Sequence, residues 1–226
     1  MSLVDGLITG LNAIQPGLGL DQRSALEHDA RELLEDNHAL LSLQQGELVE
    51  DFALPNPLGE TIRLSELLRR GPVVLTFYRG SWCNYCSRYL SDLESFLPHI
   101  RAAGAELVAI SPQTIVSSAQ TVDALALSYP VLSDFNHAVA RRFGLVFTLP
   151  EAFRKAYQDL GIDLPRFNGT STFELPIPAT YVIDVDARIA YASVDPDYTR
   201  RPDPQTLLVH VEALRLPIEA RPVVDG

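Results

Sequence analysis

Cys83 and Cys86 are the only two cysteines in this chain of 226 residues, and they lie two residues apart in the stretch VVLTFYRGSWCNYC, Val73–Cys86. Two thiols at this spacing can form a redox pair, supply half of a metal site, or be two small residues of the core. A structural zinc ion needs four ligands, and the sequence has neither a second cysteine pair nor two closely spaced histidines. The spacing therefore favours a redox pair.

The residues around the two thiols predict where the thiols lie. The stretch from Val73 to Tyr78 is β-branched and aromatic and predicts a buried strand, Gly80 and Ser81 predict a turn, and a helix is expected from about Cys83. A thiol at the start of a helix meets free backbone N–H groups and the positive end of the helix dipole, which favour the thiolate. The second thiol lies one turn further along the same face, so the pair can close and reopen a small disulfide.

Apolar stretches and helical patterns alternate along most of the chain. Strands are predicted over 72–78, 105–111 and 130–134 and hairpins over 52–64 and 179–194, with helices over 87–104, 113–129, 136–144 and 202–216. Strands that alternate with helices indicate a mostly parallel sheet, and the second hairpin makes that sheet mixed. The sequence therefore predicts an α/β fold, with a central mixed sheet and helices on both of its faces.

Two segments lie outside this alternation. Residues 1–45 are predicted to be an N-terminal helical extension, with an amphipathic helix over about 21–43, and residues 46–226 are predicted to form the main domain. Within that domain, about 147–177 read as an insertion that holds one short helix at 151–160. Long insertions often form lids or binding edges, but a simple surface loop is an equally good interpretation.

The overall composition excludes several classes of function. A formal net charge of −11 disfavours a nucleic-acid surface, and no apolar run approaches the roughly 20 residues that a membrane span needs. The N-terminal stretch has no early basic residue, so a secretory signal is not expected. Two cysteines are too few for a disulfide scaffold, which favours the cytoplasm. No metal ion or organic cofactor is implied.

Three stretches of this sequence resemble a known family. They are GELVEDFALPNPLGETIRLSELLRRGPVVLTFYRGSWCNYC, VLSDFNHAVARRFGL and PIPATYVIDVDARIAY, in this order along the chain. They are similar to the alkyl hydroperoxide reductase/thiol-specific antioxidant group, the peroxiredoxin-like branch of the thioredoxin superfamily. The resemblance implies a thioredoxin-like α/β sandwich and thiol-dependent reduction of hydroperoxides.

The peroxide site of that family is only partly present. When residues are counted from Tyr78 at the end of the strand, the family's peroxidatic cysteine falls on Cys86 and its threonine falls on Cys83. The family's proline falls on Arg79, and the arginine that polarises the peroxide falls on Pro178. Arg79 is either a positive charge supplied to the site from a different place or a surface charge in the turn.

The same residues also resemble a thioredoxin motif. The stretch WCNYC, Trp82–Cys86, is similar to the thioredoxin-type Trp-Cys-x-x-Cys, and Pro178 stands where such proteins place a cis-proline. By this resemblance Cys83 is the more exposed thiol and attacks, and Cys86 resolves. The buried acid of thioredoxins falls on Phe77, so this match is incomplete as well.

The resemblance implies a thiol-dependent antioxidant oxidoreductase. Its Cys83/Cys86 pair would reduce a hydroperoxide and be recycled by an external dithiol of the thioredoxin or glutathione type, in a possible homodimer. A thioredoxin-like enzyme that acts on protein disulfides is one alternative, and a non-catalytic redox-sensing or binding module is another. The residues expected to line the site are Tyr78, Arg79, Trp82 and Pro178.

Overall fold

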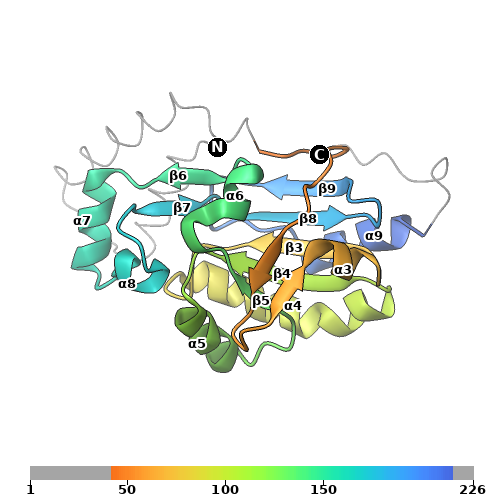
Figure 1. Cartoon of the computed structure of the whole chain (residues 1–226), viewed down its shortest axis with the longest axis horizontal. Helices are drawn as coiled ribbons and strands as arrows, with labels where there is room; N and C mark the ends of the chain where they lie inside the picture. Colours follow the sequence, from red (N-terminus) through yellow and green to blue (C-terminus); the bar gives the residue numbers. More distant parts are fainter. Residues whose placement is uncertain (1–41, 216–226) are drawn as a thin grey trace.

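The computed structural model describes residues 42–215, and their centre is a mixed sheet of five strands (Figure 1). The strand order is β5-β4-β3-β8-β9. The strands are β3 (Val73–Phe77), β4 (Glu106–Ser111), β5 (Val131–Ser133), β8 (Ala179–Ile183) and β9 (Ile189–Val194). Every residue of β3 and β8 is buried, as expected of central strands covered on both sides.

The direction of each strand follows from the connection that leads to it. β3, β4 and β5 are parallel to one another, and α4 (Asn84–Ala102) and α5 (Ile115–Leu125) connect them. β8 is antiparallel to β3, and β9 is antiparallel to β8 across a tight hairpin. The mixed sheet that the sequence predicted is confirmed.

The two faces of the sheet carry different helices (Figure 1). Neighbouring residues of a strand point to opposite faces, and Thr76 hydrogen-bonds Thr180 on the face where Tyr89 of α4 also approaches Thr180. On the other face, Phe77 packs against Phe143, which directly follows α6 (Ala138–Arg142). The last helix, α9 (Pro204–Ala213), packs against α4 and against the strands β8 and β9. Helices on both faces are thereby confirmed.

Four short elements complete the described secondary structure outside the insertion. The hairpin predicted over 52–64 is present as two antiparallel strands, and a short helix and a turn of 3₁₀ helix complete the set. These elements are β1 (Ala53–Pro55), β2 (Thr61–Arg63), α3 (Leu64–Leu68) and η2 (Phe135–His137).

The insertion contains more structure than its sequence predicted. Its short helix is confirmed as α7 (Glu151–Asp159), and a second helix, α8 (Leu164–Asn168), begins after the cap residue Asp163. The ends of the insertion pair as an antiparallel ribbon of β6 (Val146–Thr148) and β7 (Glu174–Pro176). Several of its apolar side chains belong to the core, namely Phe147, Leu149, Phe153, Tyr157, Leu164 and Leu175. The segment is therefore packed onto the domain and is not a simple surface loop.

The predicted N-terminal extension lies almost wholly outside the described residues. Between residues 42 and 215, no helix is both long enough and apolar enough to cross a membrane.

Candidate active site

The two thiols lie at the junction of β3 and α4, where the chain leaves the sheet. Gly80 has a φ of +148°, and a Cβ atom on it would lie 2.4 Å from Trp82 Nε1. Only glycine fits here, because a side chain would have to displace the indole ring. The carbonyl of Gly80 then accepts a hydrogen bond from the Cys83 backbone N–H at 3.1 Å, and this turn leads directly into the helix.

Gln113 fixes the turn from the neighbouring loop, which follows β4. Its side chain is fully buried, and its Oε1 accepts a hydrogen bond from the Ser81 backbone N–H at 3.1 Å. The Gln113 Nε2 donates to Ser81 Oγ, also at 3.1 Å. The Ser81 carbonyl accepts from Ser87 Oγ in the first turns of α4. The turn is therefore tied both to the sheet and to the helix that it precedes.

Cys83 is the N-cap residue of α4, and Cys86 lies in the first turn of this helix. Both cysteines are free thiols, and both are buried, with exposed fractions of 1% for Cys83 and 0% for Cys86. Cys83 is the more exposed thiol, as expected, but by 1% only, so the sulfur of Cys83 is closed off from solvent. The physical reason is that the guanidinium of Arg79 lies directly against its sulfur.

Arg79 is the central group of the site. It is 1% exposed, its Nη2 donates to Cys83 Sγ at 3.4 Å, and its Nη1 donates to the Tyr157 hydroxyl at 3.0 Å. Its Cζ lies 3.4 Å from the ring centroid of Tyr198 and 5.1 Å from that of Trp82, within the range of cation–π attraction. The interpretation of Arg79 as a surface charge is wrong.

No carboxylate among residues 42–215 forms an ion pair with Arg79. A buried cation without a counter-charge is strongly unfavourable, so an anion is expected within reach. The acidic groups beside it are two thiols and two phenols, of Cys83, Cys86, Tyr157 and Tyr198. Burial alone would lower the pKa of Arg79, but these neighbours outweigh that effect and raise it, so the guanidinium stays charged.

The two thiols have opposite pKa shifts. A hydrogen bond from the Cys86 thiol, followed by the charge and hydrogen bond of Arg79, holds the pKa of Cys83 well below its usual range, although burial opposes this. Burial, followed by the hydrogen bond and negative charge of Cys83, raises the pKa of Cys86 well above its usual range. Burial also raises the pKa of Tyr157 and that of Tyr198. Of the acidic groups beside Arg79, Cys83 is therefore the one whose ionised form the site favours.

The other residues expected to line the site lie around the junction of β3 and α4. Trp82 is half-buried, and its ring meets the edge of Tyr157 at 5.4 Å between centroids. Tyr78 is buried at the end of β3, and its burial raises its pKa to about 12. Pro178 is buried just before Ala179, which is the strand partner of Phe77.

The expectation of a cis-proline at Pro178 is wrong. No peptide bond between residues 42 and 215 is cis. The chain runs extended from β7 into β8 with only Ile177 and Pro178 between these strands, and the Ile177 N–H donates to the Leu145 carbonyl. A trans bond continues such an extended chain, so Pro178 follows the course of its two strands.

Three side chains of the site were missed by sequence reasoning. Tyr157 comes from α7 of the insertion, and Tyr198 and Arg201 come from the segment between β9 and α9. Arg201 Nη2 donates to Cys86 Sγ at 3.5 Å, and its guanidinium lies 5.8 Å from the ring centroid of Tyr89. All three lie more than 70 residues beyond the cysteines along the chain, and no spacing pattern links them to the motif.

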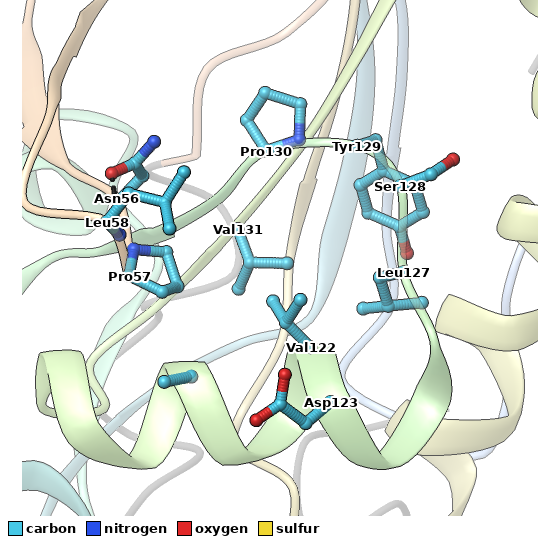
Figure 2. A pocket seen from close by; sticks show the side chains of 11 residues that line it. Asn56, Pro57, Leu58, Val122, Asp123, Leu127, Ser128, Tyr129, Pro130 and Val131 are labelled. Atoms are coloured by element: carbon cyan, nitrogen blue, oxygen red, sulfur yellow. Dashed lines mark hydrogen bonds between the residues drawn. The ribbon is translucent and has the colours of Figure 1, made fainter.

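A hollow of about 430 Å³ opens on the Cys86 side of the site. Arg201 and Tyr89 line it together with Arg88, Asp92 and Asp203. Figure 2 shows a different hollow of about 480 Å³, where Leu58 lies on one side, Leu127 on the other, and Val122 of α5 between them. None of the residues that contact the cysteines lines this second, mostly apolar hollow.

Comparisons with known proteins agree with this architecture. A putative peroxiredoxin of Mycobacterium tuberculosis is 33% identical over 103 residues, which cover 46% of this chain and 67% of that protein. The thiol-disulfide oxidoreductase ResA of Bacillus subtilis is 26% identical over 113 residues, which cover 50% of this chain and 62% of ResA. The alignments thus span about two thirds of these relatives.

The crystal structure of the peroxidoxin BcpB of Mycobacterium tuberculosis superimposes with a TM-score of 0.61 at 25% identity, covering 77% of this chain and 99% of BcpB. The thioredoxin-like fold predicted from the sequence is confirmed by this match. The family model for AhpC/TSA proteins matches residues 45–192, which is more than half of the chain. These residues include both cysteines and Arg79, and the chain therefore belongs to the AhpC/TSA family.

Proposed function

We propose that this protein is a thiol peroxidase in which the Cys83 thiolate reduces a hydroperoxide and Cys86 resolves the product. The observation that carries the proposal is the contact of 3.4 Å between the Arg79 guanidinium and Cys83 Sγ in a buried site where no carboxylate of residues 42–215 pairs with Arg79. The attacking species in such chemistry is the thiolate. Of the two sulfurs, Cys83 is the one whose pKa is lowered, and its position at the N-cap of α4 adds the field of the helix dipole.

The burial of both sulfurs favours a small substrate. The two cysteines are 1% and 0% exposed. A small hydroperoxide can enter such a site, whereas a protein disulfide would require the segment around the junction of β3 and α4 to open first. Two buried donors have no hydrogen-bond partner among residues 42–215, namely Trp82 Nε1 and Nε of Arg79, whose guanidinium contacts Cys83. A buried donor without a partner is unfavourable, so peroxide oxygen is a suitable acceptor for the guanidinium.

The proposed cycle has three steps, which are attack on the peroxide, resolution by Cys86 and reduction of the disulfide. The Cys83 thiolate attacks one oxygen of the hydroperoxide, an S–O bond forms as the O–O bond breaks, and the alkoxide takes up a proton to leave as an alcohol. The Cys86 thiol then loses its proton and attacks the Cys83 sulfenic acid, so that an S–S bond forms and hydroxide leaves as water. An external dithiol of the thioredoxin or glutathione type returns two electrons and two protons by disulfide exchange.

The cycle also bears on the cellular compartment of the protein. Both cysteines are free, and the cycle needs a supply of reduced thiols, so we place the protein in the cytoplasm. Assembly into a homodimer remains a prediction.

The test uses Cys83→Ser and Cys86→Ser in two assays, hydrogen peroxide consumption with a thioredoxin recycling system and insulin disulfide reduction. We expect Cys83→Ser to abolish peroxide consumption. Cys86→Ser should keep one turnover per chain and accumulate a sulfenic acid on Cys83, which dimedone labelling and mass spectrometry detect. Peroxide consumption that survives in Cys83→Ser and is lost in Cys86→Ser would assign the attack to Cys86 and overturn this order.

Thiol-disulfide exchange is a second candidate function, and one observation favours it. The lowered pKa belongs to Cys83, the first cysteine of the Trp-Cys-x-x-Cys motif, and not to Cys86, on which the peroxidatic cysteine of the family falls. Insulin reduction by the wild type without peroxide consumption would support this function. Inactivity in both assays would leave the third alternative, a redox-sensing or binding module.

A further inference from the structure

Each of the two sulfurs has an arginine of its own. Arg79 contacts Cys83 Sγ, and Arg201, from the segment between β9 and α9, contacts Cys86 Sγ at 3.5 Å. Arg201 is not an extended surface side chain, because its Nη1 donates to the Arg200 carbonyl at 2.7 Å and its guanidinium lies near the ring of Tyr89. It also lies beyond residues 45–192, the part of the chain that the family model matches.

The second step of the proposed cycle requires ionisation of Cys86, whereas the sulfur to which Arg79 donates is that of Cys83. Cys86 must lose its proton before it attacks, yet it is fully buried in the first turn of α4. In the resting state, the negative charge of Cys83 opposes this ionisation. Once Cys83 is a neutral sulfenic acid, that opposition is gone, and the guanidinium in contact with Cys86 favours the thiolate.

We propose that Arg201 is a catalytic residue that stabilises the Cys86 thiolate during resolution of the Cys83 sulfenic acid. This inference rests on the proposed function. Arg201 keeps the positive charge at Cys86 while Arg79 remains paired with Cys83 and Tyr157. The two arginines therefore act in different steps. Arg79 stabilises the Cys83 thiolate for attack on the peroxide, and Arg201 stabilises the Cys86 thiolate for closure of the disulfide.

The surroundings of Arg201 are consistent with this role. It is half-buried and lines the hollow on the Cys86 side, and no ion pair neutralises it among residues 42–215. Its neighbour Arg200 differs, because it is exposed and paired with Asp197 at 3.3 Å. Arg200→Gln therefore removes the same charge from the same loop without touching a sulfur, which makes it the matched control for Arg201→Gln.

The test follows a single turnover after a pulse of hydrogen peroxide, with separate rates for formation of the sulfenic acid and for closure of the disulfide. A hydrogen bond to a charged group is typically worth enough to change a rate about ten- to one-hundredfold. We expect Arg201→Gln to slow closure by about this factor and leave sulfenic acid formation unchanged. Arg201→Lys should restore part of the closure rate, and Arg200→Gln should match the wild type. Equal closure rates in Arg201→Gln and the wild type would overturn the proposal.

A second readout needs no peroxide and keeps the inference testable if the proposed function fails. In Cys83→Ser, the Cβ chemical shift of Cys86 reports its ionisation directly. The charged or titratable groups near Cys86 in this background are Arg79, Arg201, Tyr78 and Tyr157. We expect Cys86 to ionise at a higher pH in Cys83→Ser/Arg201→Gln than in Cys83→Ser, because the double variant lacks the guanidinium at this sulfur. Coincident titration curves of Cys86 in the two variants would contradict the assignment. Failure of the wild type to consume peroxide would instead contradict the proposed function.

Discussion

At the scale of single residues, the site depends on one buried charge. Arg79 has no carboxylate partner among the described residues, and its two Nη donors contact a phenol and a thiol. The thiol is the stronger acid of these two groups, so charge balance is achieved when Cys83 ionises. The pKa of Cys86 is shifted in the opposite direction, because burial and then the neighbouring Cys83 raise it.

The first prediction at this scale concerns Arg79. Arg79→Met removes the positive charge beside Cys83, so we expect the pKa of Cys83 to rise toward its ordinary value of about 8.5. The rate of reaction with hydrogen peroxide at neutral pH should then fall at least about tenfold, because one unit of pKa is a tenfold change in thiolate. The peroxide rate of Arg79→Lys should lie between those of the wild type and Arg79→Met, because lysine keeps the charge but lacks the planar guanidinium that reaches both Cys83 and Tyr157.

The control for this measurement is Arg69→Met, because Arg69 is exposed and its ion pair among residues 42–215 is with Glu66. Stopped-flow peroxide kinetics and thermal unfolding are measured on all variants. An unfolded variant is recognised in the unfolding curve, and Arg79→Lys then carries the test. A folded Arg79→Met with the peroxide rate of the wild type would show that the guanidinium does not activate Cys83.

At the scale of secondary structure, three elements deliver the groups that meet at the thiols. The junction of β3 and α4 brings Arg79 and both cysteines, the helix α7 brings Tyr157, and the segment before α9 brings Arg201. The insertion that holds α7 is therefore part of the site. Its ribbon of β6 and β7 fixes α7 at the end of the sheet near α8 (Figure 1).

The prediction for these elements concerns the hydroxyl of Tyr157. Tyr157→Phe keeps the ring against Trp82 but leaves Arg79 Nη1 without its acceptor at 3.0 Å. A buried donor without a partner costs about 1–3 kcal/mol, so we expect a loss of this size in the free energy of unfolding from urea titration. Tyr85→Phe, on the half-buried ring that meets Tyr198, is the matched control. Equal stability of the two variants would show that α7 does not hold Arg79 in place.

The sequence predicts the secondary structure around the thiols better than it predicts which distant side chains contact them. The strand, the turn at Gly80 and the start of the helix at Cys83 follow from local residue types, and the structure agrees with all three. Tyr157 and Arg201 are brought in by tertiary packing, which no local pattern reports. The burial of Cys83 could not be predicted for the same reason, because the group that covers it is held by residues distant in the chain.

At the scale of the whole molecule, the fold keeps both sulfurs away from water. The central strands β3 and β8 are fully buried, and helices on both faces complete the core around the junction where the thiols lie. Burial strengthens electrostatic effects, because water no longer screens the charges. The opposite pKa shifts of two thiols that lie on one helix turn are therefore a property of the intact fold, and unfolding should remove them.

The most direct test of the central claim measures the ionisation of each cysteine in the reduced, folded wild type. Protein labelled with ¹³C at the cysteine Cβ atoms is titrated by NMR, and each resonance is assigned with the two serine variants. We predict that Cys83 is a thiolate at neutral pH and takes up its proton only well below the ordinary value of about 8.5, while Cys86 remains a thiol until well above it. A thiolate on Cys86, or two thiols that both titrate near the ordinary value, would contradict the account.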